Sequence, residues 1–117
     1  MSEGVQTIIF PVQDLEKAKA VFAALLGAAP YADTPYYVGY KVAGQDVGLD
    51  PNGHAQGMTG PTAFFHVADI KARLAALLEA GAQTVQDVRD VGGGRLIATV
   101  EDADGNAIGL LQDPQTS

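Results

Sequence analysis

The sequence contains no cysteine, and only seven of its 117 residues are lysine or arginine. Without cysteine, disulfide bonds and thiolate chemistry are excluded. Fourteen acidic residues bring the formal net charge to −7, and the basic residues are scattered along the chain. A surface that neutralises phosphates needs clustered lysine and arginine, so we expect no nucleic-acid partner. The acidic balance either favours a cationic ligand or serves solubility, and both interpretations stay open.

Long apolar runs are also missing. No stretch approaches the roughly 20 residues of a membrane span, and no secretory signal pattern is present at the N-terminus. We therefore expect no membrane partner and a cytoplasmic location. The share of hydrophobic residues is 47% and that of charged residues is 18%, which is typical of a globular protein whose length suits one domain.

One design occurs twice in the chain at a constant offset. Thr7, Phe10, Val12 and Asp14 match Thr62, Phe65, Val67 and Asp69 in that order. Each copy is typical of a strand that turns sharply into a helix whose N-cap is the aspartate. An internal repeat sets the architecture, and two copies predict a pseudo-twofold domain built from duplicated halves.

The first half continues with a helix and a hairpin. We expect a strand over residues 5–12, a helix that begins after Asp14 and ends at Gly27, and a hairpin turn at Gly44-Gln45. Alternation along the hairpin directs Tyr36 and Tyr40 toward the helix and Tyr37 toward the opposite face. The apolar stripe predicted for the helix consists of Leu15, Ala18, Phe22, Leu25 and Leu26.

The second half repeats this order from Thr62. Asp69 starts a helix that ends at Gly81, and strands follow over residues 84–91, 95–102 and 106–112. The inner stripe of this helix is predicted to be Ile70, Leu74, Leu77 and Leu78. The predicted class is therefore α+β, with two βαβββ modules. Module one covers residues 1–52, the linker 53–61, and module two 62–117.

Three segments resemble the vicinal oxygen chelate superfamily of glyoxalase I, extradiol dioxygenases and bleomycin resistance proteins. They are Val12-Gln13-Asp14-Leu15-Glu16-Lys17-Ala18 with Phe22 and Leu26-Gly27, the second copy Val67-Ala68-Asp69-Ile70, and the hairpin Asp102-Ala103-Asp104-Gly105-Asn106-Ala107-Ile108-Gly109-Leu110. The resemblance implies that the sheets of the two modules curl around a central cavity.

Enzymes of this superfamily mostly hold a divalent metal with four strand residues, usually His, Gln or Glu. The resemblance places those four positions at Thr7, Gly48, Thr62 and Gly109. A metal needs several donor atoms at about 2 Å, and threonine and glycine are poor sources of them. We therefore predict neither a metal nor another cofactor, and we expect the four small residues to leave room for a larger ligand.

Other residues with suitable chemistry lie on the sheet faces turned away from the helices. His66 is the best catalytic candidate, as a general base or a hydrogen-bond donor to a ligand, or it is paired within the protein. Lys41 and Arg95 either hold a charged ligand or form ion pairs with Asp50 and Glu101. The expected ligand-binding residues are Thr7, Ile9, Tyr37, Lys41, Gly48, Thr62, Phe64, His66, Arg95, Thr99 and Gly109.

The leading functional hypothesis is a metal-independent small-molecule binding protein of the glyoxalase/bleomycin resistance type. It would sequester an amphipathic or aromatic ligand, with or without positive charge, as antibiotic resistance proteins of this kind do. The resemblance also implies a homodimer. The alternative is an enzyme, such as a lyase, an isomerase or a dioxygenase-like protein, with a non-standard or metal-free active site. His54 and Met58 in the linker are either a lid or an exposed loop.

Overall fold

The computed structural model describes residues 2–114 and has two compact units. The first unit is Thr7–Thr62, and the second consists of residues 63–114 together with residues 2–6. No helix in the described part of the chain is long and apolar enough to cross a lipid bilayer.

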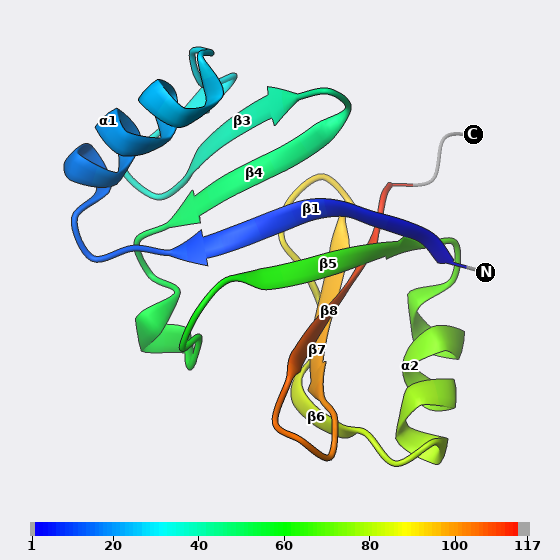
Figure 1. Cartoon of the computed structure of the whole chain (residues 1–117). Coiled ribbons are helices and arrows are strands. Elements are labelled where there is room, and N and C mark those ends of the chain that lie inside the picture. The colour runs from blue at the N-terminus through cyan, green and yellow to red at the C-terminus, as the bar shows by residue number, and fades with distance from the viewer. Residues whose placement is uncertain (1, 115–117) are drawn as a thin grey trace. The chain divides into compact units, whose positions relative to one another are not determined.

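The first unit folds as a strand, a helix and three further strands (Figure 1). The elements are β1 (Ser2–Pro11), of which residues 7–11 belong to this unit, α1 (Leu15–Leu26), β2 (Ala32–Asp33), β3 (Val38–Val42) and β4 (Gln45–Asp50). Strand β4 pairs with β1 in parallel and with β3 in antiparallel orientation, and β2 pairs with the far side of β3. The strand order is therefore β1-β4-β3-β2, starting from β1.

The second unit repeats this topology. It comprises β5 (Thr62–Val67), α2 (Ile70–Glu79), β6 (Gln83–Asp90), β7 (Leu96–Glu101) and β8 (Ala107–Gln112), and a 3-10 helix (His54–Gln56) lies in the preceding linker. Strand β8 pairs in parallel with β5 and antiparallel with β7, which pairs with β6. The order β5-β8-β7-β6 matches that of the first unit, so the predicted α+β class and both βαβββ modules are confirmed.

Helix α1 covers one face of the first sheet. Val38, Tyr40 and Leu49 are fully buried beneath it, and the rings of Phe10 and Phe22 lie 4.9 Å apart between centroids. The helix residues packed on this core include Leu15, Ala18, Phe22 and Leu26. The prediction that Leu25 belongs to the same stripe is wrong, because 72% of this residue is exposed. Helical spacing defines the centre of a stripe, but the surface available to it defines its width.

Helix α2 packs on the second sheet in the same way. The buried core there consists of Val67, Ile70, Leu74, Ala98, Val100 and Leu110. Asp69 caps the helix as predicted, because its carboxylate accepts a hydrogen bond from the Ala72 amide at 3.1 Å. The Gln112 side chain accepts a second one from the Ile70 amide at 2.8 Å. Leu78, predicted to face inward, is 41% exposed.

The turn between β3 and β4 lies one residue earlier than the sequence suggested. Val42 pairs with Gln45, so Ala43 and Gly44 form the turn, with φ values of 53° and 78°. A two-residue turn with positive φ at both central positions is of type I′, which follows the twist of the strands. The register shifts by two residues, so the predicted faces of both strands are retained.

Replacing Ala43 tests this turn. A non-glycine residue in the left-handed region is strained, and asparagine tolerates that region better than alanine. We expect Ala43→Asn to raise the free energy of unfolding by about 0.5–1 kcal/mol in a urea titration. Ala103→Asn, in another exposed hairpin, is the control. A lower stability of Ala43→Asn would contradict the turn assignment.

Tyr40 makes stability dependent on alkaline pH. Its hydroxyl donates a hydrogen bond to the Lys19 carbonyl at 3.1 Å, and burial raises the pKa of the Tyr40 phenol above its ordinary value of about 10. A raised pKa in the folded state means that the stabilisation is complete below pH of about 10 and is lost as pH rises further. We expect the free energy of unfolding to fall more steeply above this pH in wild type than in Tyr40→Phe, measured by urea titration. If the free energy of unfolding fell equally with pH in both proteins, the assigned role of Tyr40 would be contradicted.

Candidate functional site

In the first unit, the face of the sheet opposite α1 has two neighbouring glycines beside an isoleucine. Ile9 of β1 lies beside Gly48 of β4, which lies beside Gly39 of β3. Gly48 and Gly39 are buried. The neighbouring row contains Thr7, Asp46 and Lys41 in the same strand order.

Aromatic rings occupy the space above these glycines. A Cβ at Gly48 would lie only 2.8 Å from Cε1 of Tyr37 and 2.7 Å from Cδ1 of Ile9, and the Tyr37 hydroxyl is closer still. A Cβ at Gly39 would lie 2.9 Å from Cζ of Tyr31. Tyr37 therefore lies on the face predicted for it. The expectation that the glycine leaves open room is wrong, because the ring fills that room.

The second unit has the same arrangement of an aromatic ring over a strand glycine. Gly109 of β8 pairs with Phe64 of β5 on one side and with Thr99 of β7 on the other. A Cβ at Gly109 would lie 2.5 Å from Cδ2 of Phe64, which is itself buried. In both units, the strand position that the family resemblance assigns to a metal ligand is thus covered by an aromatic ring.

The residues at the four assigned metal positions do not suit a divalent cation. Thr7 and Thr62 are each only 3% exposed and offer hydroxyl groups, while Gly48 and Gly109 have no side chain to offer. Within the part of the chain that the structure describes, no three His, Cys, Asp or Glu side chains gather as a metal site would require. The donor set therefore does not fit the metal of the family's enzymes.

His66 belongs to a cluster of three polar side chains in the second unit. It is buried on β5, and its Nδ1 lies 3.2 Å from Oδ2 of Asp113. Arg95 donates a hydrogen bond from a terminal guanidinium nitrogen to the other oxygen of Asp113 at 3.0 Å. A carboxylate that accepts from Nδ1 orients the imidazole and leaves Nε2 as the basic nitrogen.

A second charged group lies on the first unit. Lys41 Nζ is 3.7 Å from Oδ1 of Asp46 and 5.8 Å from the centroid of the Tyr31 ring. Lys41 and Arg95 thus form ion pairs, but with Asp46 and Asp113 rather than with Asp50 and Glu101. Sequence reasoning missed Asp46, Asp113 and Tyr31, since their roles depend on contacts across strands and loops that no local pattern reveals.

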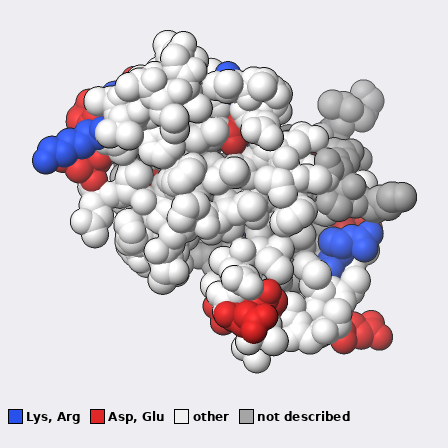
Figure 2. All heavy atoms as spheres, in the orientation of Figure 1, with Lys and Arg blue, Asp and Glu red and all other residues white. Residues whose placement is uncertain are grey.

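The remaining candidates lie apart from these clusters. Tyr36 is 81% exposed, so the prediction that it packs against the helix is wrong. His54 is exposed in the 3-10 helix of the linker, and Met58 is half-buried beside Gly53. Figure 2 shows one face of the molecule, on which no broad patch of lysine and arginine side chains is visible.

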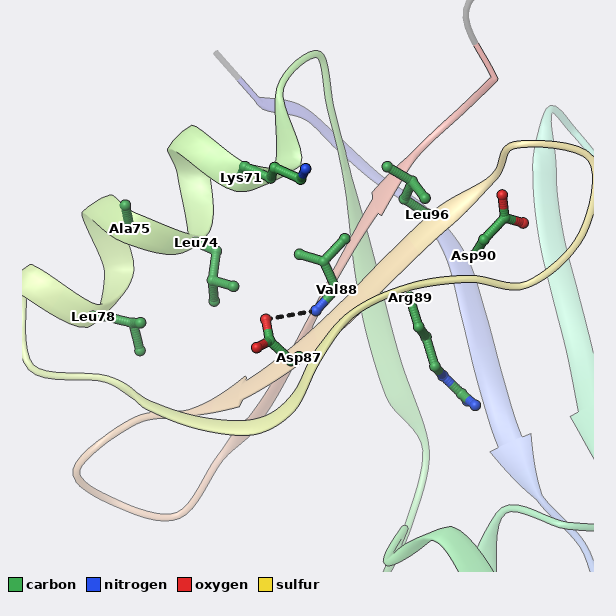
Figure 3. A pocket seen from close by; sticks show the side chains of 9 residues that line it. All are labelled: Lys71, Leu74, Ala75, Leu78, Asp87, Val88, Arg89, Asp90 and Leu96. Carbon is green, nitrogen blue, oxygen red and sulfur yellow. Dashed lines mark hydrogen bonds between the residues drawn. The ribbon is translucent and has the colours of Figure 1, made fainter.

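A groove of about 550 Å³ lies between α2 and β6. Figure 3 shows Leu74 and Leu78 projecting from the helix toward Val88, whereas Arg89 points away from the helix. None of the residues predicted to bind a ligand lines this groove. The residues that line it are Lys71, Leu74, Ala75, Leu78, Asp87, Val88, Arg89, Asp90 and Leu96. It lies on the helix side of the sheet, away from His66 and Phe64.

Solved structures of low sequence identity share this fold. A methylmalonyl-CoA epimerase from Mycobacterium tuberculosis is 18% identical with a TM-score of 0.75, covering 98% of this chain and 90% of its own. A glyoxalase/bleomycin resistance protein/dioxygenase superfamily member from Vibrio splendidus 12B01 is 18% identical with a TM-score of 0.71, covering 97% and 99%. A protein described as an NAD-dependent benzaldehyde dehydrogenase from Legionella pneumophila is 15% identical with a TM-score of 0.74, covering 91% and 96%.

Sequence comparison gives a consistent result. No curated protein matches the chain. The sequence profile of the Glyoxalase/Bleomycin resistance protein/Dioxygenase superfamily matches residues 4–110, which is nearly the whole chain. The duplicated βαβββ topology, the structural neighbours and this match agree, and the chain belongs to the glyoxalase/bleomycin resistance protein/dioxygenase superfamily.

Proposed function

We propose that this protein binds a small amphipathic or aromatic molecule without a metal. The observation that carries the proposal is the pair of tyrosine rings lying on Gly39 and Gly48 in the first unit. The Tyr37 ring covers Gly48, one of the positions where a metal-ligating side chain of the family would stand, and the Tyr31 ring covers the neighbouring Gly39. Tyr31 is 57% exposed, so a planar ligand has an aromatic surface to stack on.

We extend the proposal by analogy with the family. The protein acts in the cytoplasm as a homodimer and sequesters its ligand, as bleomycin resistance proteins do, which makes antibiotic resistance its biological role. Native mass spectrometry of the purified protein measures subunit number, bound metal and retained small molecules together.

Ligand and metal titrations test the proposal. We expect 1-naphthol, a neutral planar probe, to bind in a fluorescence titration, and Tyr37→Leu to weaken binding about threefold to tenfold because a stacked ring is lost. Tyr36→Leu, at an exposed neighbouring position, is the matched control and should leave binding unchanged. We expect no stoichiometric binding of Zn²⁺, Ni²⁺ or Mn²⁺ by calorimetry. Binding of one of these ions at Thr7 and Thr62 would overturn the proposal.

A specific observation also supports the enzyme alternative. Asp113 orients the imidazole of His66, which is the arrangement of a general base, and structural neighbours include methylmalonyl-CoA epimerases. In this alternative, His66 removes a proton from the carbon next to a carbonyl group and a solvent proton replaces it. Arg95 holds the second oxygen of Asp113 and so keeps the carboxylate in place.

Deuterium exchange tests this alternative. A base that removes such a proton in D₂O should incorporate deuterium into small β-dicarbonyl or thioester probes, observed by NMR. We expect His66→Gln to reduce the rate at least about 100-fold, the contribution of a positioned general base. His54→Gln, which changes an exposed linker histidine, should leave the rate unchanged. Exchange no faster than in buffer, or equal in wild type and His66→Gln, would exclude His66 as a base.

A further inference from the structure

Asp46 holds a buried carboxylate oxygen that lacks a hydrogen bond. The side chain is only 12% exposed, and no donor among residues 2–114 forms a hydrogen bond to its Oδ1. Leaving such an oxygen without a hydrogen bond is energetically unfavourable, so a buried acceptor of this kind in a sheet face calls for an explanation. Asp46 lies in the row beside the tyrosine-covered glycines, between Thr7 and Lys41.

Lys41 compensates the Asp46 carboxylate only in part. Its Nζ lies 3.7 Å from Oδ1 of Asp46, which is longer than the 2.7–2.9 Å of a charge-assisted hydrogen bond. The lysine side chain is 64% exposed, so it can swing away into solvent. The ammonium group therefore sits beside the carboxylate without being firmly bound to it.

The same ammonium group also faces an aromatic ring. Lys41 Nζ lies 5.8 Å from the centroid of Tyr31, within the range of a cation–π interaction. Tyr31 is held in this place by Gly39, whose missing side chain admits the ring, and by a 2.9 Å hydrogen bond from the Tyr31 amide to the Gly39 carbonyl. One cation thus contacts a carboxylate and an aromatic ring, the pair of groups that binds organic cations.

We propose that Asp46 and Tyr31 form a recognition site for the cationic group of an aromatic ligand, and that Lys41 is an internal cation which the ligand displaces. The inference rests on the proposed function and specifies its ligand class, a planar aromatic molecule with a protonated or quaternary nitrogen. The planar part of the ligand lies against the tyrosine rings while its nitrogen takes the place of Lys41 Nζ. The net charge of −7 adds a long-range attraction for such a molecule.

Three probes of similar size and different charge test the site: 1-methylquinolinium, 1-naphthol and 1-naphthoate. We expect wild type to bind the cation most tightly and the anion most weakly in fluorescence titrations. Lys41→Met removes the competing ammonium and should tighten binding of the cation about fivefold to tenfold, with naphthol unchanged. Asp46→Asn, which keeps the shape of the side chain, should weaken cation binding by a similar factor.

Charge-matched variants separate this site from a general effect of net charge. Lys17→Met lies at an exposed position of α1, and Asp87→Asn lies in the second unit; both should leave all three affinities within twofold of wild type. Thermal unfolding confirms that each variant is folded. In NMR spectra, the chemical shifts of the Lys41 ε-methylene protons should change when methylquinolinium binds, and they should change less when naphthol binds.

The outcomes distinguish the cation site from the proposed binding function. Binding of naphthol together with no preference for the cation, or no effect of Lys41→Met and Asp46→Asn, would overturn the cation site and leave the proposed binding function intact. If Lys41→Met tightened the binding of methylquinolinium and naphthol equally, the lysine would act only by blocking the site sterically. That result would also overturn the cation site. Failure of all three probes to bind would overturn both proposals.

Discussion

Three glycines determine which side chains pack on the sheet faces that the helices do not cover. At Gly39, Gly48 and Gly109, a single added carbon would overlap the ring of Tyr31, Tyr37 or Phe64. Because strand glycines carry no side chain, these rings can approach the backbone closely. Each unit thereby gains an aromatic surface on the side that its helix does not cover.

The two units share a topology but differ in the chemistry beside these rings. In the first unit, Lys41 lies near Asp46 and the Tyr31 ring, an arrangement suited to holding a positive charge. In the second unit, Asp113 joins His66 to Arg95, an arrangement suited to orienting an imidazole. In both units the helix-facing side of the sheet holds a buried apolar core, whereas the opposite sides carry different polar groups.

Membership of the superfamily therefore defines the scaffold and leaves the chemistry to individual side chains. The three structural neighbours described above share 15–18% identity with this chain, and their own descriptions include an epimerase and a dehydrogenase. A fold hosts many functions because catalytic and binding groups occupy positions that stability does not constrain. For this chain, the positions that distinguish the two units are the ones beside the glycines.

Local patterns were sufficient to predict the repeat, both helix starts at Asp14 and Asp69, and the burial of Tyr40, because capping and side-chain alternation depend on neighbouring residues. The family resemblance, rather than a local pattern, assigned Thr7, Gly48, Thr62 and Gly109 to the metal positions and so indicated that metal donors are missing there. Tertiary structure alone decided that rings fill the space above the glycines, that Asp113 reaches His66, and that Leu25 is exposed. Those outcomes depend on loop paths and on the width of the covered sheet, and contacts between residues distant in the chain determine both.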